Sequence, residues 1–124
     1  PDGTDGWVRL ARAYDVLGQN EKALEALANA ARSAPDDLDV QLSFLELILA
    51  SGSTSTDITR ATAALAAAKK IAPNNPQTLF FEGHLARLAG NDGTARIAWT
   101  ALLKLMEPGS GPAKALEAEI NKLN

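Results

Sequence analysis

The chain has 124 residues, no cysteine and a formal net charge of −3, and 46% of its residues are hydrophobic while only 5% are aromatic. This length suits one domain with a modest core, and the lack of cysteine excludes disulfides, thiolate metal ligands and cysteine catalysis. The interspersed charges form no basic patch, which argues against nucleic-acid binding.

Residues 7–35 predict two short helices joined by a turn at Gly18. Trp7, Leu10 and Tyr14 are three or four residues apart, which places them on one face of a helix. Glycine suits the left-handed conformation that ends a helix, and the alanine-rich second helix allows close packing. Such a hairpin cannot bury its apolar face alone, so we expect stacked copies of it.

The apolar frame of this hairpin recurs. Trp7 and Gln41 are 34 residues apart, as are Gly18 and Gly52, and 34 residues is the period of the tetratricopeptide repeat. The three copies of the frame are Trp7, Leu10, Tyr14, Gly18, Ala23, Leu27, Ala30 and Pro35; Gln41, Phe44, Ile48, Gly52, Ala61, Leu65, Ala68 and Pro73; and Leu79, Glu82, Ala86, Gly90, Ala95, Trp99 and Leu102. The alternative is a plain antiparallel helical bundle with chance periodicity.

The predicted fold class is therefore all-α, a right-handed helical solenoid of the tetratricopeptide-repeat (TPR) type. It comprises one domain over residues 1–124, with three helix-turn-helix repeats over about 4–37, 38–75 and 76–108. A capping helix over 112–123 carries a single apolar seam with polar residues on its other faces, as the end of a repeat array requires.

The second repeat departs from the pattern. Its first helix, from Leu38 to about Ser51, is apolar on nearly every side, which predicts a central helix covered on both flanks. A long Ser/Thr loop over 51–57 follows, and Thr56 or Asp57 is expected to cap the next helix. The third repeat begins with Asn75 as a helix cap and Pro76 in the first turn.

The sequence contains no catalytic constellation. His84 is the only histidine and lies within a predicted helix, without cysteines for a zinc site or a nucleophile elbow beside it. No phosphate-binding loop is present. The prediction is a protein that is not an enzyme and has no catalytic residue, metal or cofactor.

In stacked helical hairpins the first helices line the concave side and the second helices line the convex side. The residues expected to face the concave groove are Val8, Arg9, Arg12, Leu42, Glu46, Leu49, Phe80, Phe81, His84 and Arg87. Neighbouring side chains on a helix point about 100° apart, so at least one of the two phenylalanine rings should be exposed. An open apolar trough with charged edges suits an amphipathic helix or an extended peptide.

Two features of this groove have alternative interpretations. The exposed ring either contacts a ligand or packs under the last helix. Glu82 stands where the repeat favours an aliphatic residue, so it either places a charge at the groove or marks a shifted helix in which Leu85 fills the gap.

Four segments together resemble the C-terminal periplasmic domain of c-type cytochrome biogenesis proteins, the CcmI/CycH/NrfG group. They are W-V-R-L-A-R-A-Y-D-V-L-G-Q, the Ser/Thr loop, P-N-N-P-Q-T-L-F-F-E-G and A-R-I-A-W-T-A-L-L. The resemblance implies a chaperone that binds the C-terminal helix of apocytochrome c and delivers the client to the haem ligation machinery. It also implies a periplasmic location, with a membrane anchor in the full-length protein.

A second hypothesis is a generic TPR scaffold that bridges proteins of a bacterial envelope complex through its convex face. No apolar run approaches the roughly 20 residues needed to span a bilayer, so we expect no membrane contact by this segment. The chain begins with proline rather than methionine. We therefore expect that it is part of a longer protein, in which a hydrophobic anchor precedes Pro1.

Overall fold

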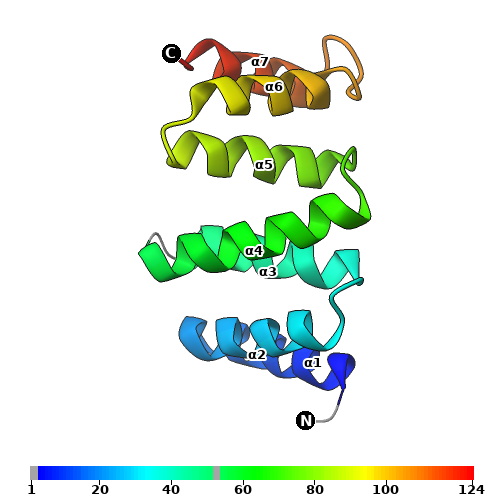
Figure 1. Cartoon of the computed structure of the whole chain (residues 1–124), viewed down its shortest axis with the longest axis vertical. Coiled ribbons are helices and arrows are strands. Elements are labelled where there is room, and N and C mark those ends of the chain that lie inside the picture. The colour runs from blue at the N-terminus through cyan, green and yellow to red at the C-terminus, as the bar shows by residue number, and fades with distance from the viewer. Residues whose placement is uncertain (1–2, 52–53) are drawn as a thin grey trace. The chain divides into compact units, whose positions relative to one another are not determined.

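The computed structural model describes residues 3–51 and 54–124, and every regular element among them is a helix, which confirms the predicted all-α class. The helices are α1 (Thr4–Val16), α2 (Asn20–Ser33), α3 (Leu38–Ser51), α4 (Ser55–Ile71), α5 (Pro76–Leu88), α6 (Asp92–Leu103) and α7 (Gly111–Asn121) (Figure 1). The pairs α1–α2, α3–α4 and α5–α6 form helical hairpins.

The chain divides into two compact units, residues 1–72 with α1 to α4 and residues 73–124 with α5 to α7. Each unit is described by itself. The single domain over 1–124 and the three repeat boundaries stay predictions.

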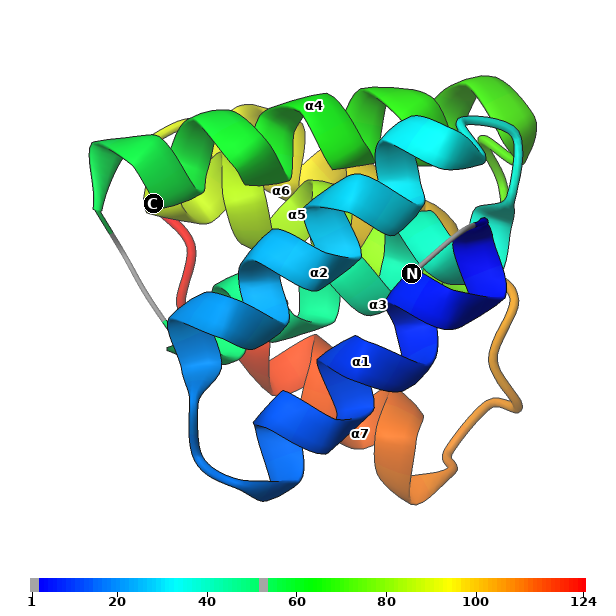
Figure 2. The same cartoon turned by 90° about the horizontal axis from the view of Figure 1, so that it is seen from below.

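In the first unit, α1 packs against α2, α2 against α3, and α3 against α4 (Figure 2). Alanines supply much of the contact surface, since Ala23, Ala30, Ala61 and Ala68 are completely buried. Their small side chains let neighbouring helices approach closely. Larger residues fill the remaining space, and the largest apolar side chains that are fully buried in this unit are those of Leu24, Leu45 and Ile48.

Helix α3 buries residues on several of its faces, as its all-round apolar character predicted. Its buried residues are Val40, Gln41, Leu42, Phe44, Leu45 and Ile48. The helix therefore belongs to the core and leaves only part of its surface for contacts with other molecules.

In the second unit, the buried indole of Trp99 on α6 forms the centre of a cluster with Leu79 of α5 and Leu116 of α7. Ala113, Leu116 and Leu123 are buried, whereas most of their neighbours in sequence are exposed. The predicted single apolar seam of the last helix is thus confirmed.

Several predicted helix ends are confirmed. Gly18 adopts φ of +74° after α1, as the hairpin turn requires, and Gly90 does the same after α5 with φ of +78°. The Asn75 side chain accepts hydrogen bonds from the main-chain N–H groups of Gln77 and Thr78, and Pro76 occupies the first turn of α5.

The predicted cap of the fourth helix is wrong. Thr54, rather than Thr56 or Asp57, caps α4, and the Asp57 carboxylate accepts a hydrogen bond from the Thr54 N–H. The Thr54 hydroxyl in turn accepts from the Asp57 N–H, which completes a reciprocal capping box. This pairing starts the helix earlier than expected, and residues 52 and 53 of the predicted loop lie outside the described part of the chain.

Candidate partner-binding site

A hollow of about 330 Å³ lies between α1 and α3 in the first unit. These are the first helices of the first two hairpins, the helices that were expected to line a groove. The hollow brings together three predicted groove residues, Val8 and Arg12 of α1 and Glu46 of α3. Its other lining residues are Ala11, Asp15, Leu27, Ser43, Leu47 and Ala50.

The floor of this hollow is apolar and its edge is charged. Ala11 and Leu27 are buried at the floor, whereas Arg12, Asp15 and Glu46 are exposed at the edge. Within the part of the chain that the structure describes, none of these three charges takes part in an ion pair. The hollow therefore offers apolar contact area beside charges that are available to a ligand.

Other predicted groove residues of this unit lie elsewhere. Leu42 is only 5% exposed, so the prediction that it lines an open trough is wrong: its side chain belongs to the core because α3 is covered on several faces. Leu49 is half-buried and Arg9 is exposed, and neither lines the hollow.

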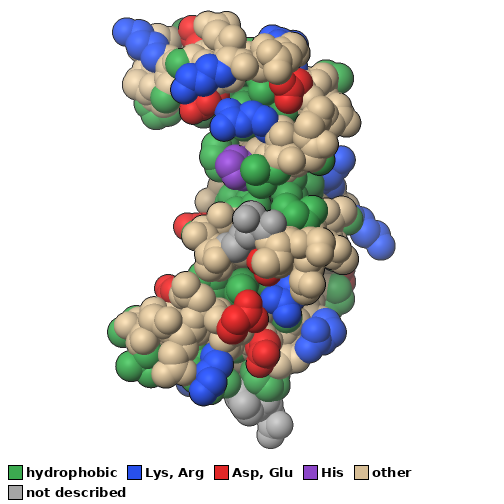
Figure 3. Space-filling view, turned by 90° about the vertical axis from the view of Figure 1, so that its left-hand side faces the viewer, with side chains coloured by type: hydrophobic (Ala, Val, Ile, Leu, Met, Phe, Trp, Pro, Cys, Tyr) green, Lys and Arg blue, Asp and Glu red, His purple; other side chains and the backbone are tan. Residues whose placement is uncertain are grey.

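In the second unit, Phe80, His84 and Arg87 follow one face of α5 at steps of four and three residues. Phe80 is 44% exposed, which confirms that at least one of the two adjacent rings remains accessible. Its ring stacks against that of His84, with centroids 6.1 Å apart, and against that of Trp99, 6.5 Å away. The single histidine is visible in Figure 3 beside hydrophobic and basic side chains.

Phe81 lies behind this surface. Its ring is 9% exposed and meets Phe80 edge-on, with centroids 5.5 Å apart and the planes inclined by 66°. The expectation that it faces an open groove is therefore wrong. Because neighbouring side chains on a helix diverge, exposing Phe80 turns Phe81 toward the interior of the unit.

A contact that sequence reasoning missed holds Phe80 in place. The Trp99 Nε1–H donates a hydrogen bond of 3.1 Å to the main-chain oxygen of Phe80. The indole approaches α5 at Gly83, where an added Cβ would lie 2.1 Å from Trp99 Nε1. The sequence did contain a signal for this contact, a lone glycine inside a helical pattern. A glycine at such a position often marks the place where another side chain packs closely against the helix.

Arg87 already has partners within the second unit. Its guanidinium lies 2.9 Å from the Glu119 carboxylate of α7 and 5.6 Å from the centre of the Trp99 ring. The hydrogen bond from Arg87 and the charge of Lys122 lower the pKa of Glu119. Arg87 is thus part of the attachment of α7, and its charge is largely compensated.

Burial lowers the pKa of His84, and the charge of Arg87 lowers it further, while Glu119 acts in the opposite direction. The imidazole is therefore neutral near pH 7. Among the described residues, no group of three or more acidic, histidine or cysteine side chains is placed to hold a metal ion. The side chains around His84 can stack and donate hydrogen bonds.

Glu82 is only partly buried, while Leu85 on the same helix is buried. The burial of Leu85 agrees with the interpretation that the helix is shifted, so that Leu85 takes the place of the aliphatic residue that Glu82 replaces. No helix in the described parts of the chain has the length and hydropathy needed to cross a membrane.

A family model described as the TPR domain of cytochrome c-type biogenesis protein H matches residues 1–112. These residues include α1 to α6 and the start of α7. No curated protein matches the chain.

Proposed function

The chain belongs to the family of cytochrome c-type biogenesis protein H TPR domains, and on this premise we propose that it is an apocytochrome c chaperone. Membership indicates a protein-binding role in c-type cytochrome maturation and an association with the cell envelope. TPR domains are typically non-catalytic interaction modules. Within that role, the proposed activity is to hold the C-terminal helix of the client.

The observation that carries this proposal is the hollow between α1 and α3. An amphipathic helix binds by laying its apolar face into an apolar groove, and Val8, Ala11 and Leu27 supply such a floor. Affinity would come from apolar area removed from water, at about 25 cal/mol per Å² before the costs of ordering. Arg12 would orient the client by pairing with a carboxylate.

The second unit supports the proposal independently. The exposed ring of Phe80 is held by Trp99 and His84, so it loses little conformational freedom when a ligand covers it. Aromatic side chains fixed in this way are common anchors in protein interfaces. We therefore assign Phe80 to client contact as well.

The proposed setting is the bacterial periplasm, with the domain anchored to the membrane in the full-length protein. The proposed partners are apocytochrome c and the haem ligation machinery that receives it. These assignments follow the family and the resemblance in sequence rather than any single side chain.

The test is a titration of the protein with a peptide that corresponds to the C-terminal helix of a c-type cytochrome. We expect Arg12→Gln and Phe80→Ala each to weaken binding about five-fold or more, which corresponds to about 1 kcal/mol. Lys70→Gln and Ile97→Ala are matched controls, since both residues are exposed and lie outside the hollow and the Phe80 cluster. Unchanged binding in both variants would remove the hollow and the Phe80 cluster from the proposal.

The alternative is a scaffold that bridges envelope proteins through its second helices. Its supporting observation is Ile97 of α6, a large apolar side chain that is 74% exposed. If Ile97→Ala abolishes capture of an envelope protein while Arg12→Gln and Phe80→Ala do not, the scaffold hypothesis is favoured over the chaperone.

A further inference from the structure

A second hollow, of about 310 Å³, lies between α1 and α2 in the first unit. It shares no lining residue with the hollow between α1 and α3, which the proposed chaperone activity uses. The apolar residues Trp7, Leu10 and Tyr14 line it from α1, and the charged residues Lys22 and Glu25 line it from α2. Neither α3 nor α4 contributes to it, so this face of the hairpin is left for another molecule.

The apolar seam of α1 is incompletely buried. Trp7, Leu10 and Tyr14 carry the apolar pattern of this helix but are only half-buried. In α1, which the structure describes in full, Ala11 is the only buried residue. Leu17 continues the seam at the same spacing of three and four residues, and it is 68% exposed. The seam therefore offers apolar contact area that a single chain does not use.

The last helix of the second unit shows how such a seam looks when it is covered. The α7 seam of Ala113, Leu116, Ile120 and Leu123 has the same spacing, and all of these residues but Ile120 are buried because α7 packs against α6. The end of a helical repeat array needs a face that is polar or covered. The α1 seam is neither, so it lacks a partner in the single chain.

Two opposite charges border the hollow three residues apart on α2. Lys22 and Glu25 are exposed, and within the described residues neither forms an ion pair, with the other or with any further side chain. The Lys22 Nζ lies 5.7 Å from the centre of the Tyr14 ring, which keeps the ammonium group beside the apolar seam. Both charges are therefore available to a partner that presents the same two charges in reverse order.

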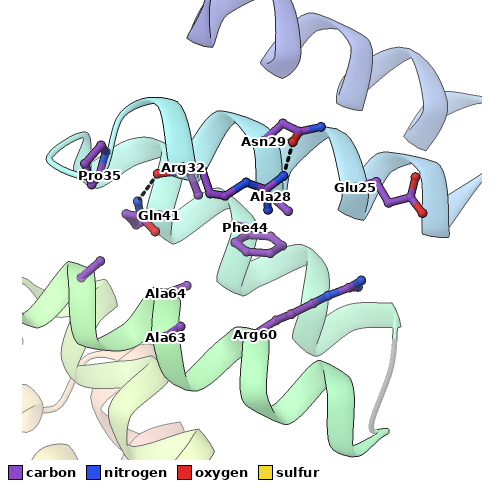
Figure 4. A pocket seen from close by; sticks show the side chains of 12 residues that line it. Glu25, Ala28, Asn29, Arg32, Pro35, Gln41, Phe44, Arg60, Ala63 and Ala64 are labelled. Carbon is purple, nitrogen blue, oxygen red and sulfur yellow. Dashed lines mark hydrogen bonds between the residues drawn. The ribbon is translucent and has the colours of Figure 1, made fainter.

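Glu25 also borders a larger cavity, of about 650 Å³, between α2, α3 and α4 (Figure 4). The two arginines of that cavity have other partners. Arg32 donates a hydrogen bond to the Asn29 side chain, and Arg60 pairs with two other acids. The Glu25 carboxylate is therefore not neutralised from this side.

A second copy of the same surface meets both requirements. Two α2 helices that cross antiparallel on a two-fold axis place Lys22 opposite the partner's Glu25 and Glu25 opposite the partner's Lys22, so both pairs form at once. The two α1 seams then cover each other, and the two-fold symmetry closes the assembly. A ligand with charges of one sign would satisfy only one of the two residues.

We propose that the chain forms a two-fold symmetric dimer through the hollow between α1 and α2. The α1 seams supply the apolar contact area, and Trp7 and Tyr14 are of the residue types that are enriched at such interfaces. The two Lys22–Glu25 pairs fix the orientation of the chains. The hollow between α1 and α3 stays open in both chains, so dimerisation does not depend on the chaperone activity.

The test is sedimentation equilibrium of the 124-residue protein, over concentrations from about 10 μM to about 1 mM. We expect a monomer–dimer equilibrium. Lys22→Glu and Glu25→Lys should each weaken dimerisation about ten-fold or more, because each variant turns both symmetric pairs into repulsions. The double variant should return to within about three-fold of the parent protein, since its swapped charges are again complementary.

The matched controls are Lys114→Glu and Glu117→Lys. These two residues are also exposed and three residues apart on a helix, α7, and their substitution changes the net charge by the same amount. Fluorine nuclear magnetic resonance (NMR) of protein labelled with 5-fluorotryptophan provides a second measurement. The Trp7 signal should shift as the protein concentration rises, whereas the signal of Trp99, which is buried in the second unit, should not.

Four outcomes would overturn the proposal. They are a monomer over the whole concentration range, association beyond a dimer, equal weakening in the control variants, and no recovery in the double variant. A monomer whose Trp7 signal shifts on addition of the cytochrome peptide would also overturn it, and would assign this surface to the client. Since the chaperone is tested with variants of Arg12 and Phe80, the failure of one proposal is distinguishable from the failure of the other.

Discussion

At the scale of single residues, the contact between Gly83 and Trp99 predicts an unusual stability effect. Gly→Ala inside a helix ordinarily stabilises it by about 0.5–1 kcal/mol. At Gly83 the new Cβ would lie 2.1 Å from Trp99 Nε1, so the indole must move and its hydrogen bond to Phe80 is disturbed. We expect Gly83→Ala to lower the free energy of unfolding by about 1–3 kcal/mol, measured by urea denaturation with circular dichroism.

Gly93 provides the control for this prediction. It also lies in a helix, but an added Cβ there would be 3.9 Å from the nearest atom, the Asn91 Oδ1. Gly93→Ala should therefore be neutral or slightly stabilising. If both variants gained stability equally, the packing role of Gly83 would be contradicted.

His84 predicts a dependence of stability on pH. Burial and the charge of Arg87 lower its pKa in the folded state below the usual value of about 6.5. The unfolded chain therefore binds the proton more readily, so stability decreases as the pH falls through about 6.5. The stability that His84 contributes is fully lost once the pH is below its folded-state pKa. It is fully retained when the pH is well above the pKa of the unfolded chain.

The measurement is an NMR titration of the His84 ring, whose midpoint should lie below about 6.5. The decrease in unfolding free energy from about pH 7.5 to about pH 5 should be smaller in His84→Gln than in the parent protein. The carboxylates contribute to the pH dependence of stability in both proteins, so the difference between the two proteins reports on His84. A midpoint at or above the usual value would refute the assigned environment of His84.

At the scale of elements, mutations at the start of α4 can test whether Thr54 caps this helix, as observed, or Thr56, as one of the two caps expected from the sequence. Thr54 forms the capping box with Asp57, so Thr54→Ala should cost about 1 kcal/mol of stability. Thr56→Ala should have little effect, since Thr56 lies in the exposed first turn of the helix. Thermal unfolding of both variants measures the difference in stability. A larger loss in Thr56→Ala than in Thr54→Ala would favour the cap expected from the sequence.

Helix α3 shows a limit of periodicity, which placed both Leu42 and Leu49 at the groove although Leu42 is buried. Leu42 is 5% exposed, so Leu42→Ala should lower the unfolding free energy by about 2–5 kcal/mol through the cavity it leaves. Leu49 on the same helix is only half-buried, so Leu49→Ala should cost less. Chemical denaturation checks the order, and equal small losses would restore Leu42 as a surface residue.

At the scale of the whole molecule, each of the two compact units contains one tryptophan, Trp7 in the first and Trp99 in the second. Protein labelled with 5-fluorotryptophan should therefore give one fluorine signal from each unit. The single-domain prediction requires both native signals to disappear at the same urea concentration. Two separate midpoints would show that the units unfold independently.

Local patterns were sufficient for most elements of this protein, although they misplaced the start of α4. The all-α class, the hairpin turn at Gly18, the Asn75–Pro76 helix start and the apolar seam of α7 were all predictable from sequence. Each depends on residues within a few positions of one another, because helical periodicity and capping are local properties of the chain. The resemblance to the cytochrome biogenesis family, confirmed over residues 1–112, also lay in such short segments.

Tertiary packing decided which side chains these elements make available. It exposes Phe80 and buries Phe81, places Leu42 in the core, and pairs Arg87 with Glu119, which is 32 residues away. Periodicity cannot predict these outcomes, because a helix that is apolar on every side has no preferred buried face until its neighbours are in place.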